Sequence, residues 1–73
     1  MNNVLAAHVL LSHLPEIKDG AYKTATEIAI ETLCKDGIND WKKLGGENTS
    51  ISAKEYLMLT DEQWNRYVPK LLD

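Results

Sequence analysis

Residues 4–15, VLAAHVLLSHLP, form an apolar run that only two histidines and one serine interrupt. In a helix these apolar side chains would surround the whole cylinder instead of lining one stripe, and such a helix has to be enclosed by other structure. A chain of 73 residues offers little for that, because a chain of this size buries only about 60–65% of the surface that its unfolded form exposes. We therefore expect this segment to have more apolar surface than a single copy of the chain can cover.

The local signals in this run are those of a helix. Asn2 or Asn3 can cap its N-terminus, and Pro15 disfavours a continuation of the helix beyond the residue before it. We therefore predict a helix over residues 4–14. A turn should follow at residues 15–20, where Pro, Asp and Gly are concentrated.

The same run is too short to cross a membrane, since it has about a dozen apolar residues where about 20 are needed. It also lacks the basic residues that precede the apolar part of a secretory signal and the Ala-x-Ala motif that follows it. Cys34 is the only cysteine of the chain, and a lone cysteine fits a reducing compartment. These features predict a cytoplasmic protein with no membrane partner.

The two histidines do not have the spacing of a metal-binding pair. His8 and His13 are five residues apart, so on a helix their side chains point about 140° away from each other. Cys34 has no second cysteine or carboxylate at a ligand spacing. We expect neither a metal site nor a cofactor.

Motifs of catalytic sites are also missing from the sequence. No serine, threonine or cysteine stands in a glycine elbow, and residues 43–48, KLGGEN, lack the spacing and the lysine of a phosphate-binding loop. A core as thin as this one rarely encloses a catalytic cleft. We therefore expect that the protein is not an enzyme.

Residues 21–36 carry the next helical pattern, with apolar side chains every three or four positions and two pairs of opposite charges four residues apart. Gly37 is well placed to stop this helix. An alternative remains for residues 26–32, TEIAIET, whose alternation is typical of a strand. If the segment is a helix, Ile30 falls outside the apolar pattern, which makes it a candidate for an interface.

A short helix is predicted over residues 38–44, with Gly45 and Gly46 at its end. Together with the preceding helix and the expected glycine turn, residues 29–46 form a candidate helix-turn-helix, so that DNA binding is the alternative function. Asp40 would lie at the start of the recognition helix and repel phosphates. The eight Lys and Arg residues are also spread along a chain with a net charge of −3, and we therefore rank nucleic acid below protein as a partner.

Two capping boxes, eight residues apart, are the most specific local signal in the chain. In each box a hydroxyl residue is followed three positions later by Glu or Gln, and a hydrophobic staple flanks it. They predict one short helix at residues 52–58 and another that begins at residue 61. The boxes are Ser52–Glu55 and Thr60–Gln63, and the staple pairs are Ile51–Tyr56 and Leu59–Trp64.

The last predicted helix continues an apolar stripe through Tyr67 and Val68 to Leu71, although Pro69 has to kink or restart it. Four or five short helices result from these assignments. The predicted fold is a single all-α domain over residues 1–73, a small irregular bundle, and a small α+β domain is the alternative.

These features favour a small acidic protein that binds a partner protein and inhibits or modulates it, the partner being a different protein or a second copy of the chain. Chains of this size without a catalytic site include many inhibitors encoded by phages or other mobile elements. Apolar residues of the first helix, helped by the Tyr and Trp anchors that are common in interfaces, would cover a site on the target. The candidate partner-binding residues are Val4, Leu5, Val9, Leu11, Ile30, Trp41 and Tyr67.

Overall fold

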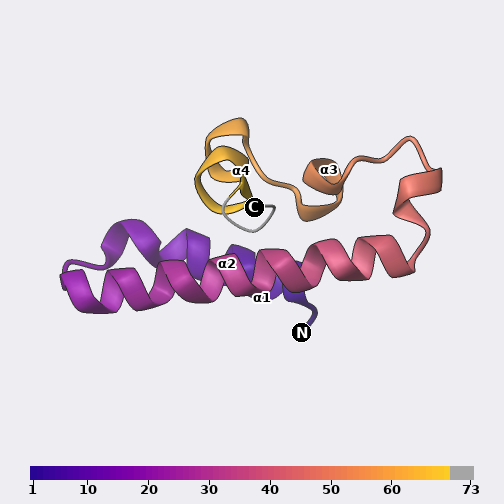
Figure 1. Cartoon of the computed structure of the whole chain (residues 1–73). Coiled ribbons are helices and arrows are strands. Elements are labelled where there is room, and N and C mark those ends of the chain that lie inside the picture. The colour runs from indigo at the N-terminus through magenta and orange to yellow at the C-terminus, as the bar shows by residue number, and fades with distance from the viewer. Residues whose placement is uncertain (70–73) are drawn as a thin grey trace.

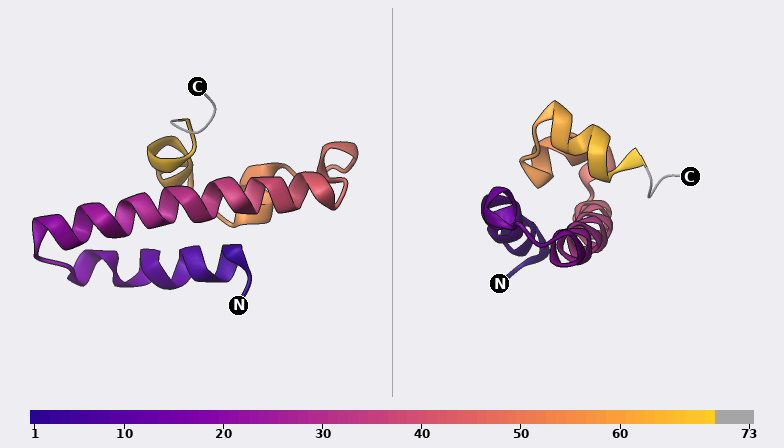
Figure 2. Two further views of the ribbon diagram at one scale, coloured as in Figure 1. Left: turned by 60° about the horizontal axis from the view of Figure 1, so that its bottom comes forward. Right: turned by 90° about the vertical axis from the view of Figure 1, so that its left-hand side faces the viewer.

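The computed structural model describes residues 1–69, which contain four α-helices, two single 3-10 turns and no strand. The all-α prediction is confirmed, and the α+β alternative is wrong. Helices α1 and α2 lie side by side and antiparallel, and α3 and α4 cover one face of this pair (Figure 1; Figure 2). The helices are α1 (Asn3–His13), α2 (Gly20–Lys43), α3 (Ala53–Leu57) and α4 (Asp61–Tyr67), and the turns are η1 (Leu14–Glu16) and η2 (Gly46–Asn48).

Helix α1 begins and ends close to the predicted positions. The side chain of Asn2 accepts a hydrogen bond from the backbone N–H of Leu5 at 2.8 Å, which is the bond expected of an N-cap. The helix ends at His13, and Pro15 lies in the turn η1 that follows.

Helix α2 is one continuous helix of 24 residues, so the prediction of two helices separated by a glycine turn is wrong. It begins after Asp19, whose side chain caps the first turn, and it ends at Lys43. Gly45 then adopts the left-handed conformation, with φ at 79°, that commonly ends a helix. Because Gly37 lies in the interior of α2, residues 29–46 contain no helix-turn-helix.

Gly37 allows two helices to pack closely and does not end the helix. A Cβ atom at this position would lie 2.6 Å from Cδ2 of Leu57, a residue of α3 that is only 2% exposed. The missing side chain therefore lets α3 approach the backbone of α2. Glycine in a helix interior costs about 1 kcal/mol relative to alanine, and this close approach explains why the helix contains one.

The strand alternative for residues 26–32 is also wrong, because the segment lies within α2. Thr26, Ile30 and Cys34 are buried at a spacing of four residues, as on the inner face of a helix. Ile30 is completely buried, whereas Ile28 is 58% exposed. The prediction that Ile30 lies at an interface is corrected, since its side chain fills the core of a single copy.

Both predicted capping boxes form. Oγ of Ser52 accepts a hydrogen bond from the N–H of Glu55 at 3.1 Å, and the Glu55 carboxylate accepts one from the N–H of Ser52 at 3.3 Å. The corresponding bonds between Thr60 and Gln63 measure 3.1 and 3.0 Å. Helix α4 begins at residue 61 as predicted, and Leu71 of the predicted stripe lies outside the described residues.

The core lies between the middle of α2 and the three elements that pack on it. Val4 of α1 faces Gly37, and Tyr67 of α4 is 2% exposed. Both were expected to contact a partner, but a single copy already covers them. None of the described helices is long and apolar enough to cross a membrane. The core consists of Val4, Ile30, Cys34, Ile38, Leu57, Leu59, Tyr67 and Val68.

Candidate functional site

Exposed apolar side chains of α1 and of the connection between α3 and α4 form one surface. Leu5 and Val9, which are 51% and 44% exposed, stand one turn apart on α1. Met58, which directly follows α3, is 59% exposed. Leu5, Tyr56 and Met58 help to line a hollow of about 220 Å³. We call Leu5, Val9, Tyr56 and Met58 the α1–Met58 surface.

The backbone of Met58 is in the left-handed region, with φ at 56° and ψ at 39°. Residues 1–69 have no other non-glycine residue with a positive φ. This conformation ends α3, because it turns the chain so that the N–H of Leu59 reaches back to the carbonyl of Lys54 at 3.3 Å. Glycine usually occupies such a position, since a side chain there costs about 1–2 kcal/mol. A large, exposed apolar side chain at a strained position is a feature that often marks a functional site.

His8 holds Met58 beside α1. Its Nε2 atom lies 2.8 Å from the carbonyl oxygen of Leu57, the residue just before Met58. A carbonyl oxygen can only accept a hydrogen bond, so Nε2 carries a proton and donates it. The two segments of the α1–Met58 surface are therefore joined by a direct hydrogen bond across 49 residues of sequence.

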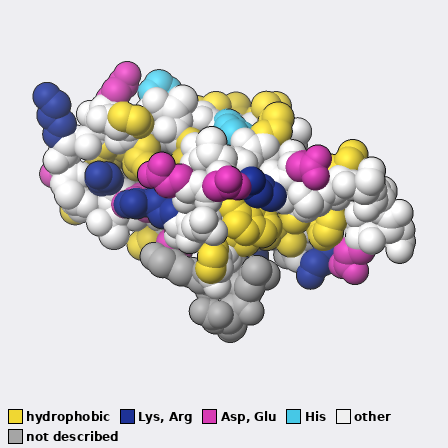
Figure 3. Space-filling model, turned by 90° about the horizontal axis from the view of Figure 1, so that it is seen from above, with side chains coloured by type: hydrophobic (Ala, Val, Ile, Leu, Met, Phe, Trp, Pro, Cys, Tyr) yellow, Lys and Arg dark blue, Asp and Glu magenta, His cyan; other side chains and the backbone are white. Residues whose placement is uncertain are grey.

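The α1 side of this surface carries no charged Asp, Glu, Lys or Arg side chain, because none of these occurs between Met1 and Leu14. The face of the molecule that bears α3 and α4 is different, since both signs of charge are interspersed on it (Figure 3). A phosphate-binding surface concentrates basic side chains, and the described residues on this face show no such concentration. An uncharged apolar surface is suited to another apolar surface.

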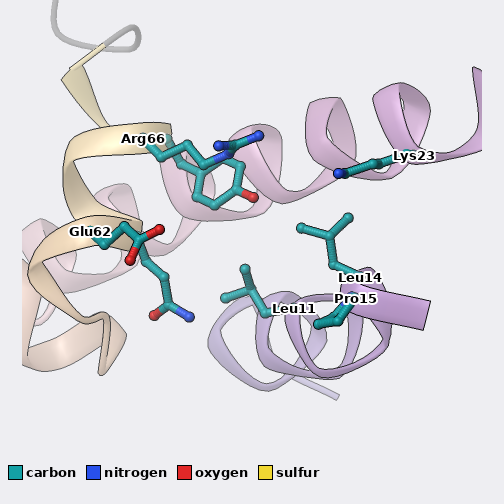
Figure 4. A pocket seen from close by; sticks show the side chains of 8 residues that line it. Leu11, Leu14, Pro15, Lys23, Glu62 and Arg66 are labelled. Atoms are coloured by element: carbon teal, nitrogen blue, oxygen red, sulfur yellow. The ribbon is translucent and has the colours of Figure 1, made fainter. Parts of the chain in front are cut away.

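A second hollow, of about 320 Å³, lies between α1, α2 and α4 (Figure 4). Leu11 and Leu14 extend into it from α1 and η1, and Lys23 and Arg66 lie across from them. Tyr67 also lines this hollow, so two of the predicted partner-binding residues, Leu11 and Tyr67, come together here.

The guanidinium beside this hollow is already paired. Nε and Nη2 of Arg66 lie 2.8 and 2.6 Å from one carboxylate oxygen of Glu27, and the hydroxyl of Tyr67 donates to the same oxygen at 3.3 Å. The hydrogen bond from Arg66 lowers the pKa of Glu27. Burial, followed by the nearby charge of Glu27, raises the pKa of Tyr67. This network joins α4 to α2, so the Arg66 cation serves the fold.

We expect the Glu27 network to make the free energy of unfolding fall as the pH is lowered into the acidic range. The folded-state pKa of Glu27 is below its ordinary value of 4.5, so the unfolded chain takes up the proton more readily. The stabilisation is complete above about pH 5 and is lost as the pH falls through the folded-state value. Glu27→Gln should therefore be less stable than wild type at neutral pH and should lose less stability on acidification. Urea unfolding at several pH values measures this difference.

Glu47→Gln is the matched control for Glu27→Gln, because Glu47 is an exposed carboxylate in η2. This variant should keep the pH dependence of the wild type. If both variants gave the wild-type curve, Glu27 would not be responsible for the loss of stability in acid.

Trp41 anchors the turn η2 and does not point away from the protein as an interface residue would. It is half-buried, and its indole N–H donates to the carbonyl of Ile51 at 2.9 Å. Its ring packs directly over Gly46, where even a Cβ atom would collide with it. Trp41 thus connects the end of α2 to the segment before α3.

The structure separates the seven predicted partner-binding residues into different environments. Leu5 and Val9 lie exposed on one surface, and the others are covered in part or completely within one copy. Met58 and His8 were not predicted. The two capping boxes are so close in the sequence that the chain has to turn tightly near residue 58. This short spacing is the sequence signal that could have indicated Met58. Of the seven predicted residues, the five that one copy covers are Val4, Ile30 and Tyr67, which are buried, and Leu11 and Trp41, which are half-buried.

Cys34, the only cysteine of the chain, is buried in the core. Burial, with a smaller effect of Glu31, raises the pKa of the Cys34 thiol to about 11, so this buried thiol stays protonated at neutral pH. Within residues 1–69 no three His, Cys, Asp or Glu side chains come together in a way that could hold a metal ion. Comparison of the chain with models of protein families, with curated proteins and with solved structures finds no match.

Proposed function

We propose that this protein works by binding a protein molecule through the α1–Met58 surface, and that it catalyses no reaction. Met58 is the observation that carries the proposal. It combines 59% exposure with a left-handed backbone that favours glycine. For the stability of a single copy glycine would serve better at this position, so the methionine side chain has its use in contact with another molecule.

The surface is already assembled before it meets a partner. The hydrogen bond from His8 to the carbonyl of Leu57 joins its two segments, and Tyr56 packs against the core. A preformed surface loses little conformational entropy on binding. Bound in this way, the protein would cover part of its target and inhibit or modulate it by steric exclusion. The lone thiol of Cys34 is in keeping with the cytoplasm, which we propose as the location.

Met58→Gly is expected to stabilise the fold and to weaken binding. The substitution removes the backbone strain, so the free energy of unfolding should rise by about 1 kcal/mol. Binding should weaken by about tenfold or more, because burying a methionine side chain contributes about 1.5–3 kcal/mol. Thermal unfolding measures the first effect, and titration with the protein that photocrosslinking at Val9 identifies measures the second. A less stable Met58→Gly protein would mean that Met58 serves the fold, which would contradict the proposal.

A photoreactive side chain tests where binding takes place. Benzoyl-phenylalanine in place of Val9 should form adducts with protein on irradiation in the native host. The same group in place of Ile28 is the control, because Ile28 is also apolar and exposed but lies on α2 outside the surface. Adducts at Val9 and not at Ile28 support the proposal. Equal labelling at both positions, or none at Val9, would overturn it.

A further inference from the structure

We infer that the molecule which covers the α1–Met58 surface is a second copy of this chain, with the two α1 helices packed antiparallel about a two-fold axis. The inference rests on the proposed function, since it names the partner of the same surface. Three observations support it, namely the absence of Asp, Glu, Lys and Arg from α1, the spacing of Leu5 and Val9, and the complementary polar side chains that flank them.

The charge distribution favours a copy of the chain at this face. Each chain has a net charge of −3, so two copies repel each other over most of their surfaces. Residues 1–14 carry no Asp, Glu, Lys or Arg side chain, and here two copies can meet without bringing like charges together. A strongly charged partner would lose the hydration of its charges at this face and gain no pairing in return. A second α1 helix has no such charges to dehydrate.

The spacing of the apolar residues is self-complementary. In a two-fold arrangement, residue i of one copy contacts residue j of the other, and j contacts i. An axis that crosses α1 midway between Leu5 and Val9 places Leu5 opposite Val9 of the second copy, and Val9 opposite its Leu5. The helices then run antiparallel, so the positive end of each helix dipole lies near the negative end of the other.

The same axis places Asn2 opposite Ser12 of the second copy, and one hydrogen bond within the chain already holds each side chain. The Asn2 side chain accepts from the N–H of Leu5 at 2.8 Å, and the Ser12 hydroxyl donates to the carbonyl of Val9 at 2.7 Å. The amide N–H groups of Asn2 and the oxygen of Ser12 remain available, so a donor of one copy faces an acceptor of the other. The apolar contacts between Leu5 and Val9 are therefore flanked by polar groups that can pair with each other across the axis.

The small size of α1 predicts a weak dimer. The helix has 11 residues, which corresponds to a length of about 16 Å. Stable interfaces usually bury about 1,200–2,000 Å² in total, and one such helix pair with Met58 at its side falls short of this. We therefore expect a dissociation constant on the order of 0.1 mM.

Charge-reversal variants test the pairing of positions 5 and 9. One chain carries Leu5→Lys and Val9→Lys, and another carries Leu5→Glu and Val9→Glu. Sedimentation equilibrium up to about 1 mM, well above the expected dissociation constant, should show dimers for wild type. Each variant alone should associate at least about tenfold more weakly, because like charges would face each other across the axis. An equimolar mixture of the two should form 1:1 dimers. Circular dichroism verifies that both variants fold.

Ile28→Glu is the control, since it adds a charge at an exposed apolar position of α2. It should associate like wild type. A wild-type chain that stays monomeric at about 1 mM, or variants that dimerise like wild type, would overturn the inference. If the monomeric chain still gives adducts of Val9 with a different protein, only the second copy is excluded and the proposed function stands. If it gives no adducts, both fail.

Discussion

Ile30→Ala is expected to lower the free energy of unfolding by about 2–5 kcal/mol. Ile30 is completely buried on the inner face of α2, so its truncation removes apolar contacts and leaves a cavity. A domain of 73 residues has a total stability of roughly 4–11 kcal/mol, so this loss should unfold a measurable fraction of the protein. Urea unfolding followed by far-UV circular dichroism measures the effect.

Ile28→Ala is the matched control for Ile30→Ala. Ile28 has the same side chain two residues earlier, but it is 58% exposed. Its truncation should change stability by no more than about 0.5 kcal/mol. In a strand both isoleucines would face the same side, and similar losses from the two variants would contradict the helical register of α2.

Gly37→Ala is expected to destabilise the protein by about 1–3 kcal/mol. In most helix interiors the same change stabilises by roughly 0.5–1 kcal/mol, because alanine is the better helix former. Here the new Cβ atom would lie 2.6 Å from Cδ2 of Leu57, so this buried side chain, or the helix that carries it, has to shift within the core. Chemical denaturation should therefore show a loss of stability where helix propensity alone predicts a gain.

Gly20→Ala separates the packing effect at Gly37 from helix propensity. Gly20 is the first residue of α2, and a Cβ atom there would have no neighbour within 4 Å. This variant should be as stable as wild type or slightly more stable. If Gly37→Ala were also stabilising, α3 would not pack against α2 at this point.

The helix starts of this protein were predictable because they depend on local contacts. Asn2, Ser52 and Thr60 each accept a hydrogen bond from a backbone N–H three residues later. Such bonds form between neighbours in the chain, whatever packs around them. Gly45 likewise ends α2 through its own backbone conformation. The all-α fold class follows from signals of this kind.

The candidate site was predictable in part. Leu5 and Val9 are exposed, in agreement with the expectation that α1 has more apolar surface than one copy can cover. Met58 could not be found in the same way, because its importance comes from a left-handed backbone and from its place beside Leu5. The bond that holds it there joins His8 to Leu57, far away in the sequence.

The tertiary structure alone decided which face of each helix is covered. A glycine such as Gly37 can end a helix or admit a neighbouring one, and the outcome here depends on Leu57, which lies in another helix. Helical periodicity gives the angle between Ile28 and Ile30, but not which of them meets the core. Caps depend on atoms a few residues apart, whereas burial depends on contacts between segments that are distant in the chain. For this reason local patterns determined where most of the helices begin, and packing determined which residues remain available to a partner.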